Sequence, residues 1–213
     1  MKSQFLRFAM AVGLIAAPCL AQQQKLVVLI LGAPGSGKST QARKINAKYG
    51  IPSISLADIL KTQQGHGKAM MSSDKKLNKR MAAAVESGAM VSSETANRLV
   101  IQRISEKDAA NGFVLDGYPF TADDAAEFEK SLAHLNLPKP VVIDLVVSDA
   151  VAMQRMEARN RADDKAGLSE PRLVDWRKQE EAILSYYPGA HKINGDQSEG
   201  QVWAAIQEVL GSR

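Results

Sequence analysis

The sequence predicts an α/β fold in which helices cover both faces of a parallel β-sheet, and two observations support this. Apolar segments typical of buried strands alternate with helical patterns, as expected when helical crossovers connect parallel strands. A glycine-rich turn links the first strand, 25–31, to the first helix, 39–49. The 213 residues are enough for one domain with a sizeable core, and no internal repeat divides them.

The other elements follow from local patterns. Thr121 with Asp124, and Ser198 with Gln201, have capping-box spacing, and Asp149 is expected to cap the helix after the fourth strand. Apolar runs predict further strands at 51–55, 113–115, 141–147 and 191–194. Helical patterns occupy 56–63, 75–87, 94–110, 121–135, the segment that Asp149 opens, 169–187 and 198–210. This order predicts a three-layer α/β/α domain.

The N-terminus has the order of a secretory signal peptide. Lys2 and Arg7 precede an apolar run over 8–20, and small residues lead to a cleavage site after Ala21. We therefore expect a signal peptide at 1–21 and a single domain at 22–213, exported or periplasmic if the signal is used and cytoplasmic otherwise. The apolar run is too short for a stable membrane anchor. An ordinary N-terminal extension on a cytosolic protein is the alternative.

Charge and cysteine content exclude several classes of function. The formal charge is +4, and removal of 1–21 leaves 25 basic against 23 acidic residues, a charge of +2. This net charge is too small to indicate nucleic acid as a partner. We also expect the protein to be a monomer. Cys19 is the single cysteine, so a mature chain has no disulfide, catalytic thiol or cysteine zinc site.

Residues 32–39, GAPGSGKS, match the phosphate-binding pattern G-x-x-x-x-G-K-[ST] without a mismatch. The glycines let backbone N–H groups turn toward phosphate oxygens, and the following helix presents its positive end. Lys38 is expected to reach the β- and γ-phosphates, and the Ser39 hydroxyl is placed for Mg²⁺. The alternative is an ordinary glycine-rich connecting turn. The place of the motif between a strand and a helix favours a fold of the P-loop NTPase type.

Further motifs resemble the adenylate kinase family. The run GSGKSTQA at 35–42 resembles that family's form of the loop, as does GFVLDGYP at 112–119. The segment 88–91 resembles the stretch before the family's monophosphate-site helix, and RADD at 161–164 is followed at family spacing by Arg172 and two tyrosines. Because several motifs occur in order from about Leu26 to Leu210, the chain is identified as a member or close relative of this family.

The resemblance implies a set of site residues. For the phosphates of ATP they are Gly35, Ser36, Gly37, Lys38, Ser39, Thr40 and Arg155. For the monophosphate, bound by an insertion at about 55–92, they are Asp58, Lys61, Val91, Asp116 and Gly117. The residues expected to be catalytic are Lys38, Arg159, Arg161 and Arg172. The arginines are included because guanidinium groups bind oxyanions bidentately. Ser39 and Asp116 are expected to hold Mg²⁺, Asp116 through a water. The alternatives are a solvated basic helix face for the arginines and an ordinary helix-terminal aspartate at 58.

The acceptor half of the site departs from the family. Phe120 replaces the arginine that follows the family's DGYP or DGFP and contacts the phosphates being joined. Residues 56–61, LADILK, replace T-G-D-x-L-R, so the threonine and glycine are lost and lysine replaces arginine. Asp124 replaces a glutamine that reads adenine, and a carboxylate lacks the amide's donor.

The lid also differs. Only Asn160 separates Arg159 from Arg161, where relatives carry several residues, so 160–170 is expected to be a reduced lid loop. We expect a nucleoside monophosphate kinase. Its phosphoryl donor is expected to be ATP bound with Mg²⁺, and its acceptor is expected to be AMP. The alternatives are a nucleotide-binding P-loop protein with weak or no kinase activity, and a kinase for another small molecule.

Overall fold

The computed structural model describes residues 24–65, 92–159, 167 and 169–211. In this part of the chain the strands form one sheet with the order β2-β3-β1-β4-β5, and every pairing is parallel. The strands are β1 (Leu26–Gly32), β2 (Ser53–Ser55), β3 (Gly112–Asp116), β4 (Val141–Val146) and β5 (His191–Asn194). The predicted strands and the parallel sheet are confirmed.

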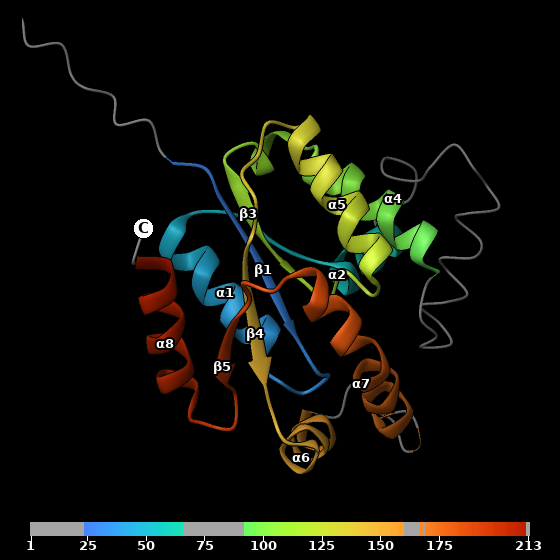
Figure 1. Cartoon of the computed structure of the whole chain (residues 1–213), viewed down its shortest axis with the longest axis vertical. Coiled ribbons are helices and arrows are strands. Elements are labelled where there is room, and N and C mark those ends of the chain that lie inside the picture. Colours follow the sequence, from blue (N-terminus) through green and yellow to red (C-terminus); the bar gives the residue numbers. More distant parts are fainter. Residues whose placement is uncertain (1–23, 66–91, 160–166, 168, 212–213) are drawn as a thin grey trace, which may run out of the picture.

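Helices cover both faces of this sheet, as Figure 1 shows, with α1 and α8 on one side and α4, α5 and α7 on the other. The predicted three-layer α/β/α fold is therefore confirmed. The helices are α1 (Lys38–Tyr49), α2 (Leu56–Gly65), α4 (Ser93–Ile104), the 3₁₀ helix η1 (Lys107–Ala109), α5 (Ala122–His134), α6 (Asp149–Arg159), α7 (Ser169–Tyr186) and α8 (Glu199–Gly211). The helix predicted at 75–87 lies outside the described residues.

Two helix boundaries differ from the sequence prediction. The helix expected over 94–110 ends at Ile104, where the Ser105 hydroxyl donates to the Ile101 carbonyl at 2.7 Å, and the chain continues as a 3₁₀ turn. Asp149 does not cap α6 but is its first residue, and the Ser148 hydroxyl accepts from the Val151 N–H at 3.4 Å. The two predicted capping boxes, at Thr121 and Ser198, are confirmed.

Strands β1 and β3 are central and buried, and their alternating side chains feed a core on each face. Val28 and Ile30 point toward α1 and α8, whereas Leu29 and Leu31 point toward α4, α5 and α7. A third apolar cluster joins α6 and α7 to the turn after β1. Its residues are Ala33, Val147, Ala152, Met156 and Leu173. This third cluster lies at the carboxyl edge of the sheet, where ligands bind in open α/β folds.

Among the helices of the described residues, none has the length and apolar character needed to cross a bilayer.

Candidate active site

The turn between β1 and α1 has the backbone of a phosphate-binding loop. Gly35 and Gly37 have φ angles of 82° and 97°, a region that favours glycine. A Cβ atom on Gly35 would lie 2.4 Å from the carbonyl oxygen of Ala152, so α6 packs directly against the loop. The Thr40 N–H donates to the Gly37 carbonyl at 3.0 Å and begins α1 beneath the loop. The positive end of α1 therefore faces the space that the loop encloses.

Lys38 folds back over this loop and is half-buried. Its Nζ donates to the carbonyl oxygens of Gly32 at 2.7 Å and Ala33 at 2.8 Å. Burial lowers the pKa of Lys38; the negative charge of Asp116 opposes this shift, and the positive charges of Arg159 and Arg172 add to it. The lysine thus lies within electrostatic reach of two arginines from separate helices.

Ser39 and Asp116 meet although 77 residues separate them. The Ser39 hydroxyl donates to Asp116 Oδ2 at 2.5 Å, in the range of charge-assisted bonds. Asp116 ends β3 directly beside Ile30 of β1 and is 4% exposed. No group of three or more His, Cys, Asp or Glu side chains gathers in the described part of the chain. A hydroxyl with one carboxylate fits Mg²⁺, which takes few protein ligands when substrate phosphates and waters supply the rest.

The structure places three of the four predicted arginines on two helices. Arg159 ends α6 and Arg172 lies in the first turns of α7, and both affect Lys38 electrostatically. Arg155 lies one turn before Arg159 on α6 and is half-buried. Arg161 lies outside the described residues. Arg159 and Arg172 both act electrostatically on Lys38, and their phosphate-binding role stays a prediction.

The predicted acceptor residues are described in part. Asp58 is exposed in the first turn of α2, where its N–H donates to the Ser55 hydroxyl at 3.0 Å. Gly117 follows Asp116 with a φ of 79°. The backbone of Lys61 belongs to α2, its side chain is outside the described set, and so is all of Val91.

Asp124 completes the predicted capping box with Thr121 and also bonds to residues outside that box. Its Oδ2 accepts from the N–H groups of Phe120 at 3.2 Å and Thr121 at 3.1 Å, and from the Ser93 hydroxyl at 3.2 Å. The residue is 1% exposed, so the carboxylate joins the starts of α4 and α5. Phe120 packs edge-on to Tyr118, with ring centroids 6.2 Å apart. The position of the family arginine is therefore part of an apolar contact.

Asp144 was missed by the sequence analysis, which treated 141–147 only as a strand. It is 1% exposed on β4, and its Oδ1 has no hydrogen-bond partner among the described residues. Burial raises its pKa and the charge of Glu180 adds to the shift, while Lys192 and then Arg177 and Lys38 oppose it. An acidic residue inside an apolar run was the available signal.

These features define a P-loop nucleotide-binding protein. They are a phosphate loop with its lysine, a serine–aspartate pair, and two arginines near that lysine at the edge of a parallel sheet. Comparison with known proteins narrows this class. The family model described as adenylate kinase matches residues 30–192. Adenylate kinases of Brucella ovis, Brucella anthropi and Brucella abortus are each 35% identical over 196 residues, covering 86% of this chain and 97% of the relative. The chain therefore belongs to the adenylate kinase family.

Proposed function

We propose that this chain is a nucleoside monophosphate kinase that transfers the γ-phosphoryl group of ATP to AMP and forms two molecules of ADP. The observation that supports this most directly is the gathering of Lys38, Arg159 and Arg172 beside the Ser39–Asp116 pair. Phosphoryl transfer needs positive charge around the equatorial oxygens of the moving group, and this arrangement supplies it from three elements. Membership of the adenylate kinase family supports AMP as the acceptor.

In the proposed reaction, an oxygen of the AMP phosphate attacks the γ-phosphorus of ATP, and the bond from that phosphorus to the β-bridging oxygen breaks. The loop N–H groups hold the ATP phosphates, and Lys38 exchanges its bonds to Gly32 and Ala33 for phosphate oxygens. Arg159 and Arg172 balance the charge of the transferring group. Mg²⁺ bound with ATP neutralises further phosphate charge, and Ser39 and Asp116 are the residues that would hold it.

The proposal assigns the remaining segments by resemblance. Residues 55–92 are the monophosphate-binding insertion, with Asp58, Lys61 and Val91 as acceptor contacts, and 160–170 is a reduced lid that includes Arg161. Helix α7 begins at Ser169, so the last residues of this lid segment are helical. The signal peptide at 1–21, export of the mature chain and a monomeric state complete the proposal.

One observation favours the alternative of a nucleotide-binding protein with weak kinase activity. Phe120 occupies the position of the family's phosphate-contacting arginine, and its ring packs on Tyr118 in the core. The side chain therefore offers no charge to the phosphates being joined.

A transfer assay separates these functions. The purified protein, residues 22–213, is incubated with Mg²⁺ and γ-labelled ATP. AMP, GMP, CMP and UMP are added in separate reactions, and the labelled products are resolved by chromatography. We expect label in ADP with AMP, and its loss in Lys38→Ala, which removes the central cation of the loop. Label released only as inorganic phosphate indicates an ATPase, and tenfold better use of another monophosphate contradicts AMP as the acceptor.

A further inference from the structure

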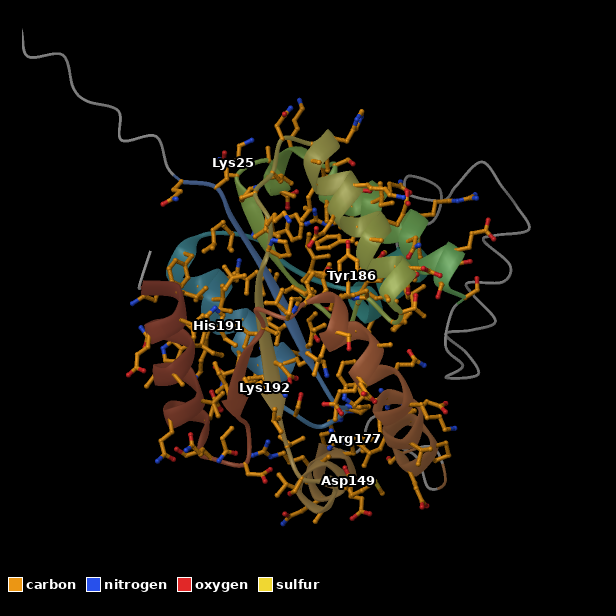
Figure 2. All side chains as sticks on the ribbon, viewed as in Figure 1. Lys25, Asp149, Arg177, Tyr186, His191 and Lys192 are labelled. Carbon is orange, nitrogen blue, oxygen red and sulfur yellow. The ribbon has the colours of Figure 1, made fainter. Side chains whose placement is uncertain are left out.

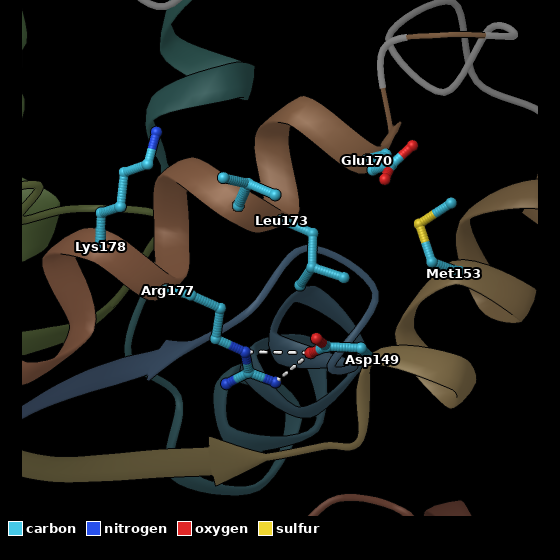
Figure 3. A pocket seen from close by; sticks show the side chains of 7 residues that line it. Asp149, Met153, Glu170, Leu173, Arg177 and Lys178 are labelled. Atoms are coloured by element: carbon cyan, nitrogen blue, oxygen red, sulfur yellow. Dashed lines mark hydrogen bonds and ion pairs between the residues drawn. The ribbon is translucent and has the colours of Figure 1, made fainter.

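Arg177 of α7 makes a dense set of contacts with the start of α6. Its Nε and Nη2 donate to Asp149 Oδ1 at 3.0 and 2.8 Å, and Nη2 also donates to the Val147 carbonyl at 2.7 Å. Its Nη1 donates to Glu180 Oε2 at 2.8 Å. Figure 3 shows the side chain reaching from α7 to Asp149, and Figure 2 places both residues at the carboxyl edge of the sheet, away from Lys25. One guanidinium thus joins the end of β4, α6 and α7.

The helices that Arg177 joins also pack on the phosphate loop. Gly35 is in contact with the backbone of Ala152 on α6, close enough to exclude any Cβ. Leu173 of α7 and Val147 share an apolar cluster with Ala33, the second residue of the loop. A change in the angle between α6 and α7 would therefore alter the surroundings of the loop as well.

Arg159 on α6 and Arg172 on α7 both lie some distance along their helices from the contact between Arg177 and Asp149. Arg172 lies five residues before Arg177, about 7.5 Å along α7 at 1.5 Å per residue, and Arg159 lies about 15 Å from Asp149 along α6. A small rotation where the helices are joined becomes a larger displacement at these side chains. A misplacement of about 1 Å can lower a catalytic rate on the order of a hundredfold.

We propose that Arg177 is a positioning residue that fixes α6 against α7 and so holds Arg159 and Arg172 in place for the transferring phosphoryl group. This inference rests on the proposed function. Arg177 differs from an exposed ion pair because its side chain is 31% exposed and donates to a backbone carbonyl as well as to two carboxylates. It does not itself contact the reacting atoms.

Arg103 provides a matched control. It forms a two-bond pair with Asp108, at 2.9 and 2.7 Å, and its side chain is 19% exposed, but it lies on α4 away from the loop. Arg177→Gln should lower kcat on the order of 10–100-fold, with little change in the KM for AMP, at a temperature well below its melting transition. Arg103→Gln should lose stability and keep kcat within about twofold.

A double-mutant cycle separates positioning from general destabilisation. Because Arg177 is proposed to act through Arg159 and Arg172 together, Arg177→Gln should cost less than threefold in a background that carries both Arg159→Ala and Arg172→Ala. Equal losses in both backgrounds, or a wild-type kcat in a folded Arg177→Gln protein, would overturn the proposal. If Arg177→Gln does not fold, Asp149→Asn removes the shared carboxylate while Arg177 keeps its bond to Val147, and the same cycle is measured with it.

An open pocket of about 660 Å³ lies beside Arg177 and allows a chemical test. It is lined by Asp149, Met153, Glu170, Leu173, Val174, Arg177 and Lys178. In Arg177→Ala, millimolar guanidinium can enter from solvent and reoccupy the bonds to Asp149 and Glu180, so kcat should rise severalfold with guanidinium chloride and not with sodium chloride. A rise that is equal with both salts, or no rise, would count against the guanidinium group as the positioning element.

Binding measurements distinguish failure of this inference from failure of the proposed function. A wild-type protein without transfer activity contradicts the proposed function only. Arg177→Gln should then still weaken Mg-ATP binding, measured by fluorescence titration, whereas Arg103→Gln should not. Unchanged Mg-ATP affinity in Arg177→Gln would overturn the positioning role in that case.

Discussion

Phe120→Arg should raise the rate of transfer to AMP. An arginine at this position would place a guanidinium beside the phosphates being joined, and one such contact is typically worth about 2.7–4 kcal/mol, or a 10²–10³-fold change in kcat. The substitution also removes the edge-on ring contact with Tyr118, at a cost of about 0.5–1.5 kcal/mol of stability. The Phe120 N–H bond to Asp124 belongs to the backbone and is kept. We therefore expect a less stable protein with kcat on the order of 100-fold higher.

Steady-state rates at saturating Mg-ATP, with AMP varied, test this expectation. Phe120→Leu is the matched control, since it shortens the side chain without adding charge and should give no gain. The reasoning is refuted if the wild type already turns over at a typical kinase rate of about 1–100 s⁻¹ and arginine adds nothing. Another cation, such as Lys61 or Arg98, would then supply the missing charge.

Three further outcomes follow from the sequence and the described contacts. Burial lowers the pKa of Lys38, and phosphate binding needs the charged amine, so ATP affinity should fall as pH rises through a value below the ordinary 10.5. Calorimetry in buffers of different ionisation enthalpy should show proton uptake on binding there, and its absence would contradict the lowered pKa. Tyr118→Phe removes the hydroxyl that lies 2.8 Å from Asn97 Oδ1 and 3.0 Å from the Asp124 carbonyl, and should cost about 1–3 kcal/mol in urea unfolding with kcat unchanged. Expression of the full chain in a Gram-negative host should give a mature N-terminus after Ala21, and an intact Met1 on cytosolic protein would show that no signal peptide is used.

The phosphate loop could be predicted because its determinants are contiguous. Glycines, lysine and serine at fixed spacing, between an apolar strand and a helix, are sufficient to indicate the backbone path. The pairing of Ser39 with Asp116 needed one more step, since the two are far apart in sequence. Parallel strands place their carboxyl ends at one edge, and family motifs indicated which aspartate ends the neighbouring strand.

Other features depend on burial and tertiary contacts that sequence patterns do not encode. Helix α4 ends at Ile104, and the Ser105 hydroxyl that follows bonds back to the Ile101 carbonyl, which the helical pattern over 94–110 did not indicate. Asp144 stands out in the sequence as an acidic residue in an apolar run, but only the structure shows that it is buried and that the charges of Glu180 and Lys38 act on it. Arg177 reaches a carboxylate 28 residues away, and no local pattern predicts that contact.

The reaction of ADP alone tests the central proposal most directly, because it requires a donor site and an acceptor site on one protein. Purified 22–213 is incubated with Mg²⁺ and ADP, and the nucleotides are separated by chromatography over time, with Lys38→Ala prepared identically as the control for contaminating kinase. A nucleoside monophosphate kinase that acts on AMP must form ATP and AMP in equal amounts, and Lys38→Ala must not. AMP with inorganic phosphate and no ATP, or ADP that stays unchanged, would contradict the proposal.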